Sequence, residues 1–138
     1  MTGAAPGAIL SLNDRKRREH SMIRRSNERV IDKPWHRFGA PGQLTVRNLI
    51  NEPEELFGKG RAFAHTTVHP GSGIGYHVHV GDGEIYFVLS GKGEYNDNNE
   101  VTTTVEAGDV TFCAPGQGHS ILCLGDEPLE LITLILYE

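Results

Sequence analysis

The sequence predicts a single all-β domain, folded as a sandwich or barrel of about nine short strands. From residue 44 to residue 137, turn residues recur at short, regular intervals between apolar or alternating segments, which is the pattern of such folds. The 17 glycines and the hydrophobic content of 38% suit a turn-rich β protein. At 138 residues the chain is long enough for one domain with a modest core.

The first half of the domain predicts four strands separated by turns. Residues 44–50 form the first clear strand, and residues 51–56 form a turn with one helical turn, because Pro53 suits the first helical position. Pro70 and Gly71 end the second strand, and Asp82-Gly83 is a favoured two-residue hairpin loop because both positions tolerate positive φ. The other three strands are expected at 61–69, 75–80 and 84–90.

The second half continues the same alternation of strands and turns. The segment 97–100, Asp-Asn-Asn-Glu, predicts a turn between two strands of a hairpin. Pro115-Gly116 and the segment 125–128, Gly-Asp-Glu-Pro, mark two further turns. The strands between these turns are expected at 92–96, 101–105, 109–114, 119–124 and 129–137.

Charge separates the N-terminal stretch from the rest of the chain. Residues 1–30 are expected to form a poorly ordered basic leader, residues 31–138 the domain, and residues 44–136 its core. The formal net charge is −5, but residues 1–21 carry +2, so the remainder carries −7. No Lys or Arg follows Lys92. This balance disfavours nucleic-acid binding by the folded domain.

The location expected for the chain is cytoplasmic. No run approaches the roughly 18 apolar residues of a transmembrane helix, so no membrane partner is expected. The apolar segment 8–12 is too short for a signal peptide, and the basic cluster follows it. The two cysteines fit a reducing compartment.

Two histidines in the third strand predict a metal site. His77 and His79 stand at positions i and i+2, so their side chains share one face of a strand. If Asp82-Gly83 forms the hairpin loop, His79 pairs with Tyr86, and Glu84 returns on the histidine face. A single histidine on an apolar face is usually a satisfied core residue. Three polar groups facing a core are costly unless a ligand binds them.

A fourth ligand is expected on a neighbouring strand, and His119 fits this position. It follows the turn at Pro115-Gly116 and opens an apolar strand. Three imidazoles and a carboxylate suit Mn²⁺, Fe²⁺, Co²⁺, Ni²⁺ or Zn²⁺. The rival interpretation is a three-histidine zinc hydratase site, in which the carboxylate of Glu84 would have no role.

The same residues carry a resemblance to the cupin superfamily. Its first motif, G-x5-H-x-H-x3–4-E-x6-G, is matched by Gly71, His77, His79, Glu84 and Gly91. Its second motif, G-x5-P-x-G-x2-H-x3-N, is matched at Gly108, Gly116 and His119. Ala114 stands at the motif's Pro, and Cys123 at its Asn. Neither position is a metal ligand in the family.

The resemblance implies a double-stranded β-helix, the jelly-roll barrel of cupins, with one divalent metal inside. More narrowly, the chain is similar to small manganese cupins related to oxalate-binding proteins and oxalate decarboxylases, so Mn²⁺ is the favoured metal. Four protein ligands leave two open positions on an octahedral ion. These positions suit a small carboxylate ligand that binds through two oxygens, such as an oxalate-like dicarboxylate or a 2-oxo acid.

Two classes of function stay open at this point. One is an enzyme, either an oxalate decarboxylase-like lyase or a metal-dependent oxygenase or isomerase. The other is a non-catalytic cupin, which either binds such a ligand through the metal or is a regulatory or structural protein whose metal mainly stabilises the barrel. Tyr86 shares the strand face of Glu84 and is the candidate catalytic residue, because it could donate a hydrogen bond to a metal-bound oxygen. Arg47 and Arg61 are the central-strand cations best placed to meet a ligand carboxylate, although a surface position is expected for each.

A homodimer is expected from the second face of the predicted hairpin of 75–80 and 84–90. Every residue on that face is apolar, so another layer must cover it. The chain has few elements left for this purpose, and cupins commonly dimerise. The residues concerned are Tyr76, Val78, Val80, Ile85, Phe87 and Leu89.

Overall fold

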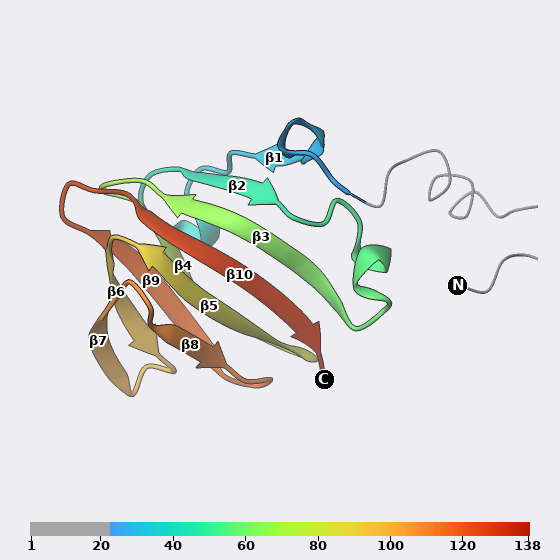
Figure 1. Cartoon of the computed structure of the whole chain (residues 1–138). Helices are drawn as coiled ribbons and strands as arrows, with labels where there is room; N and C mark the ends of the chain where they lie inside the picture. Colours follow the sequence, from blue (N-terminus) through green and yellow to red (C-terminus); the bar gives the residue numbers. More distant parts are fainter. Residues whose placement is uncertain (1–22) are drawn as a thin grey trace, which may run out of the picture.

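Two antiparallel sheets form the fold, as the computed structural model of residues 23–138 shows (Figure 1). The larger sheet has the strand order β1-β2-β3-β10-β5-β8, and the smaller sheet β4-β9-β6-β7. Three 3₁₀ helices complete it: η1 (Ser26–Glu28), η2 (Arg37–Gly39) and η3 (Pro53–Leu56). The strands are β1 (Ile31–Asp32), β2 (Leu44–Asn48), β3 (Gly60–Val68), β4 (Gly73–Val78), β5 (Asp82–Ser90), β6 (Lys92–Asp97), β7 (Val101–Glu106), β8 (Val110–Cys113), β9 (Gly118–Leu124) and β10 (Leu129–Tyr137).

This arrangement confirms the predicted all-β double-stranded β-helix. The predicted strands correspond to β2–β10, and η3 occupies the helical turn expected at Pro53. The hairpin of β6 and β7 is also confirmed, with Lys92 opposite Glu106. Asn98 and Asn99, both at φ 55°, form its turn, a left-handed conformation that Asn tolerates better than most residues.

The predicted hairpin of 75–80 and 84–90 is wrong. β4 pairs with β9 in the smaller sheet, whereas β5 pairs with β10 and β8 in the larger one. The chain crosses between the sheets at residues 79–81, where Gly81 has φ 75°. Asp82 and Gly83 begin β5 instead of forming a loop. Asp82 is 6% exposed and ion-paired, so its buried contacts override the local preference of Asp-Gly for an exposed turn.

The core lies between the sheets and follows the alternation of β10 and its neighbours. Leu129 and Leu131 point inward and are fully buried. The alternate residues Glu130 and Ile132 are partly exposed. Leu131 lies opposite Val88 of β5 and Thr66 of β3. Each leucine buried in this way contributes about 1.5–3 kcal/mol to folding.

The N-terminal part of the chain is described only from residue 23. Most of the predicted leader therefore lies outside the described residues. Its last part contacts the domain: Arg24 forms an ion pair with Glu55 of η3, and Asn51 donates a hydrogen bond of 3.0 Å to the carbonyl of Glu28.

The loop that contains η2 packs across β4. Phe38 stacks on the ring of His77, with centroids 4.1 Å apart and an interplanar angle of 14°. A Cβ at Gly75 would lie 2.0 Å from the carbonyl oxygen of Phe38, so only glycine permits this approach. Within residues 23–138 no helix has the length and apolar character needed to span a membrane.

Candidate metal centre

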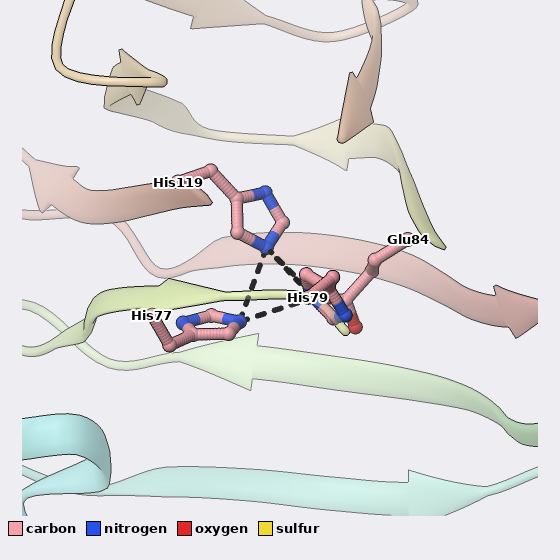
Figure 2. Close-up of side chains that lie close together, drawn as sticks. All are labelled: His77, His79, Glu84 and His119. Atoms are coloured by element: carbon pink, nitrogen blue, oxygen red, sulfur yellow. Dashed lines mark hydrogen bonds and ion pairs between the residues drawn. The ribbon is translucent and has the colours of Figure 1, made fainter. Parts of the chain in front are cut away.

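Four side chains from three strands and one crossover converge between the sheets. His77 lies next to the end of β4, His79 in the crossover after this strand, Glu84 on β5 and His119 on β9. His77 and His119 face each other directly across the β4–β9 pair. One donor atom from each of the four residues lies within 4.8 Å of the other three (Figure 2). The structure thus brings together all four residues that the sequence proposed as ligands.

The distances between these donor atoms fit a common metal ion. Nε2 of His119 lies 3.1 Å from Nε2 of His77 and 3.2 Å from Nε2 of His79. Oε1 of Glu84 lies 3.0 Å from His119, and 3.3 and 3.6 Å from His79 and His77. Donors that bind one ion at about 2.0–2.2 Å in adjacent octahedral positions are separated by roughly 3 Å.

Hydrogen bonds at the far side of two rings fix which nitrogen faces the centre. Nδ1 of His77 donates to the carbonyl oxygen of Gly75 over 2.8 Å. Nδ1 of His79 donates to Oδ1 of Asp82 over 2.7 Å. Carbonyl and carboxylate oxygens only accept, so in the neutral rings each Nε2 presents a lone pair to the centre. A cation satisfies these lone pairs together, which makes a metal the fitting occupant.

Burial and hydrogen bonding shift the pKa values of the four groups in different directions. Burial acts to raise the pKa of Glu84, but its contacts with the three imidazoles outweigh burial and hold this pKa well below its usual range. The hydrogen bond to Glu84 raises the pKa of His79. Burial lowers the pKa of His119, which is 0% exposed. Glu84 is therefore ionised and His119 neutral near pH 7, the forms that bind a metal.

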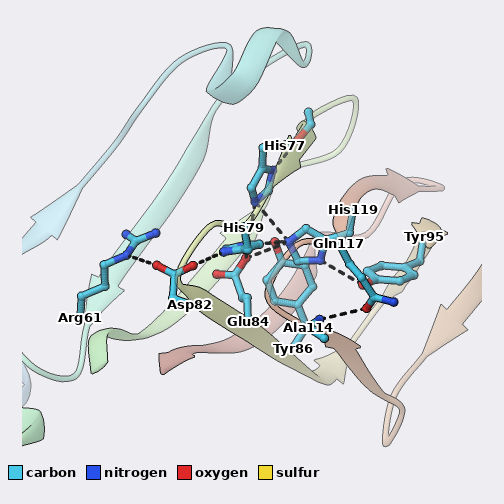
Figure 3. A network of polar contacts seen from close by, with 11 residues as sticks. Arg61, His77, His79, Asp82, Glu84, Tyr86, Tyr95, Ala114, Gln117 and His119 are labelled. Carbon is cyan, nitrogen blue, oxygen red and sulfur yellow. Dashed lines mark hydrogen bonds and ion pairs between the residues drawn. The ribbon is translucent and has the colours of Figure 1, made fainter. Parts of the chain in front are cut away.

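Asp82 and Arg61 form a chain of polar contacts to Nδ1 of His79, on the side of the ring away from the other donor atoms. Oδ2 of Asp82 accepts from Nε of Arg61 over 2.8 Å, so the chain of contacts runs from Arg61 through Asp82 to His79 (Figure 3). Burial acts to raise the pKa of Asp82, yet the hydrogen bonds from Arg61 and His79 bring it below its usual value. Carboxylate partners of this kind orient a ligating imidazole.

Sequence reasoning missed the role of Asp82 because it assigned this residue to a turn. The signal was present, since Asp82, Glu84 and Tyr86 alternate and share one strand face once β5 begins at residue 82. The expected surface position of Arg61 holds only in part: its side chain is 45% exposed, yet it lines the cavity beside the site. Arg47 donates to Thr67 over 2.7 Å and does not line that cavity.

Two tyrosines pack against His119. The ring of Tyr86 stacks on that of His119 with centroids 4.8 Å apart, and its hydroxyl lies 3.5 Å from Nε2. Its strand partners are Thr133 and Thr111, not the predicted His79. The hydroxyl of Tyr95, which the sequence did not single out, lies 3.0 Å from Nδ1 of His119. Burial raises the pKa of both tyrosines, so both hydroxyls stay protonated.

A cavity of about 310 Å³ opens beside the four residues. His77, His79, Glu84 and Tyr86 are among the residues that line it. Arg37 and Arg61 are the cations that line it. The geometry therefore offers a group of metal-binding donors that a small molecule can reach.

Comparison with known proteins gives the same assignment. Residues 64–135 match the cupin domain. The chain is 35% identical over 115 residues to an oxalate-binding protein of Thermotoga maritima, covering 83% of this chain and 93% of that protein. It is 31% identical over 87 residues to an uncharacterised protein of Methanocaldococcus jannaschii, covering 63% of this chain and 68% of that protein.

Solved structures with the same fold include two with substantial sequence identity. A predicted oxalate decarboxylase from Thermotoga maritima superimposes with a TM-score of 0.79 at 34% identity, covering 85% of this chain and 100% of that one. A double-stranded β-helix protein from Klebsiella pneumoniae does so with a TM-score of 0.63 at 25% identity, covering 86% and 91%. The chain belongs to the cupin family, as the matching cupin domain and these relatives show and as its two sheets and its converging histidines and glutamate agree.

Proposed function

We propose that this protein binds one divalent transition metal through His77, His79, Glu84 and His119, and through the metal a small acid with two adjacent oxygens. The observation that carries the proposal is the convergence of three Nε2 atoms and one carboxylate oxygen beside an accessible cavity. When bound, the metal supplies positive charge that holds and polarises the oxygens of such an acid. Mn²⁺ is the favoured ion, with Fe²⁺, Co²⁺, Ni²⁺ and Zn²⁺ as the others that this donor set suits.

The ligand class follows from the number of donors and from the relatives. Four protein donors leave two positions of an octahedral ion, which suit an oxalate-like dicarboxylate or a 2-oxo acid. The names given to the Thermotoga maritima relatives, oxalate-binding protein for the sequence match and predicted oxalate decarboxylase for the solved structure, support this class. Arg61 lines the same cavity and provides a positive charge near an incoming carboxylate.

The first test is metal content followed by ligand titration. Purified protein should contain about one transition metal per chain by elemental analysis, and Glu84→Gln and His119→Ala should lose most of it. Calorimetric titration of oxalate into the Mn²⁺-loaded protein should give saturable binding that the metal-free protein lacks. Binding of equal strength to the metal-free protein would contradict coordination through the metal.

The proposed role of Tyr86 separates an enzyme from a binding protein. Its hydroxyl is buried beside the donor atoms, and its raised pKa keeps it protonated, as a proton donor requires. If the protein turns over its acid, Tyr86→Phe should retain the metal and lower kcat about 10²–10⁴-fold. If the protein only binds, the same change should weaken binding by roughly 0.5–1.5 kcal/mol, the contribution of one neutral hydrogen bond.

Tyr95→Phe is the matched control for Tyr86→Phe. It removes the same atom from a tyrosine that contacts the other nitrogen of His119. A loss of turnover in Tyr95→Phe as large as in Tyr86→Phe would indicate a shared effect on His119, and not proton donation by Tyr86.

We also propose that the protein is a homodimer, formed through the outer face of the larger sheet. The apolar residues assigned to one hairpin face lie on two different sheets, because β4 and β5 do not pair. On the larger sheet they continue across strands, with Phe87 between Val110 and Ile132, and Ile85 between Phe112 and Leu134. Phe112 is 67% exposed and Phe87 40% exposed.

Light scattering tests the dimer. The protein at micromolar concentration should show about twice the chain mass, and Phe112→Glu should shift it toward the monomer. Val101→Glu is the control, because Val101 is 57% exposed and lies on β7 of the smaller sheet. A monomeric wild-type protein would contradict the proposal.

A further inference from the structure

The cavity beside the metal centre is much longer than an oxalate-sized ligand requires. Strand register places Tyr86 of β5, Thr133 of β10, Ala64 of β3 and Asn48 of β2 in one row across the larger sheet. All four line the cavity. The row spans three strand spacings, about 14 Å. The volume of about 310 Å³ has room for about ten water molecules at about 30 Å³ each.

Small side chains on β3 create this length. Ala62 and Ala64 point inward from the strand in the middle of the row, where larger side chains would fill the space between the sheets. The hydroxyl of Thr133 donates to the carbonyl oxygen of Ala64 over 3.4 Å, which directs this polar group to the backbone.

The character of the wall changes along the cavity. The donor side chains and Tyr86 form one section of the wall, and the charged side chain of Asp32 forms another at β1, the edge strand of the larger sheet. Between them the wall is mainly aliphatic, formed by Leu44, Val46, Ala62, Ala64, Ile74 and Ile135. An oxalate bound at the donor atoms would not reach this aliphatic section, whereas an apolar group on the ligand would contact it.

We infer that the ligand of this site is a 2-oxo acid with an unbranched apolar chain, its two adjacent oxygens at the metal and its chain along Ala64 toward Val46. This inference rests on the proposed metal-dependent binding of an acid. About one strand spacing accommodates the acid head, which leaves about 10 Å, the length of roughly a six- to eight-carbon chain. A longer chain would pass Val46 and reach the exposed Asp32 of the edge strand β1, where further methylene groups gain nothing.

The test compares oxalate with a series of 2-oxo acids of increasing chain length. Pyruvate, 2-oxobutanoate, 2-oxohexanoate, 2-oxooctanoate and 2-oxododecanoate are titrated by calorimetry into the full-length Mn²⁺-loaded protein. Each added methylene should tighten binding by about fourfold until the chain fills the cavity. Oxalate has no chain and should bind no tighter than the short members of the series.

Two variants at Val46 locate the chain. Val46→Phe should abolish the gain for 2-oxohexanoate and 2-oxooctanoate and leave oxalate binding unchanged, and retained oxalate binding also reports an intact fold and metal site. Val46→Ala should move the optimum to longer chains, which gives a second measurement in case Val46→Phe does not fold. Val101→Phe makes the same change on β7, where residue 101 is 57% exposed and away from the cavity, and should leave the series unchanged.

The outcomes separate this inference from the function on which it rests. Oxalate binding with equal affinities for all 2-oxo acids would overturn the apolar-chain ligand and leave the metal-dependent acid site standing. A chain-length gain that Val46→Phe and Val46→Ala do not alter would also overturn it. No binding of any acid to the metal-loaded protein would overturn both.

Discussion

Replacing Asp82 by Asn tests whether the contacts behind His79 control the affinity for metal. In the wild type, one carboxylate accepts two hydrogen bonds, from Nδ1 of His79 at 2.7 Å and from Nε of Arg61 at 2.8 Å. An amide of the same shape has one accepting and one donating end, so it can accept only one of them. Either Arg61 loses its acceptor, or His79 takes the tautomer that places a proton on Nε2.

The expected loss in metal affinity is about 10–100-fold, the usual effect of removing such a partner of a ligating histidine. This corresponds to about 1.4–2.8 kcal/mol. Arg61→Met should lose less, because the Arg61 side chain is 45% exposed and a solvated ion pair contributes about 0–1 kcal/mol. Asp82→Asn should therefore lower the metal affinity more than Arg61→Met does, because the Asp82 side chain is only 9% exposed.

The assay is competition for Mn²⁺ or Co²⁺ against a chelator of known affinity, with thermal melting of the metal-free proteins as a check on folding. Asp126→Asn is the matched control, since it makes the same change in the exposed turn before β10. Metal affinity in Asp82→Asn within about twofold of the wild type, with both proteins equally folded, would refute the idea that Asp82 positions His79.

Three further outcomes are expected. Leu131→Ala, at a fully buried position in the middle of β10, should lower the free energy of unfolding by about 2–5 kcal/mol in urea titrations; a loss below 1 kcal/mol would contradict its place in the core. The pKa of Glu55 is lowered to about 2, first by its hydrogen bond from Arg24, so this carboxylate stabilises the fold above pH 4.5 and loses the effect as the pH falls toward 2. Glu55→Gln should therefore destabilise the protein by about 1 kcal/mol at pH 7 and by almost nothing at pH 2, and an equal effect at both pH values would exclude the ionised form as the cause. Affinity for Mn²⁺ should fall as the pH drops, because protons compete with the metal for the histidine nitrogens. Since the pKa of His79 is raised, this fall should begin at a pH above the usual histidine pKa. An affinity that does not change from pH 8 to pH 5 would contradict histidine ligation.

The strands and turns followed from local signals. Alternation located β2–β10 to within a few residues, and Pro53 and the Asp-Asn-Asn-Glu turn at residues 97–100 marked real breaks. These features are determined by neighbouring residues, because side-chain period and backbone preference act over a few positions. Pairing did not follow from the same signals, since β4 and β5 are adjacent in sequence and lie in different sheets.

The candidate site shows the same division. Its four donor residues could be named from spacing and from the resemblance to cupins, and the structure brings them together by a route that differs from the predicted hairpin. Glu84 reaches the histidines across the space between two sheets, and not along one strand pair. The correct residues emerged because the inward face of each strand was right, although the pairing was wrong.

The sequence by itself determined which residues can bind a metal, which faces of the strands turn inward and where the chain turns. Only the tertiary structure decided that Asp82 is buried between Arg61 and His79, that Tyr95 contacts His119, and that Ala62 and Ala64 leave a long cavity beside the donors. The physical reason is that periodicity and turn preference are local, whereas these contacts join strands that are distant in sequence. Their free energy depends on which faces meet across the barrel, and that is set by the packing of the whole domain.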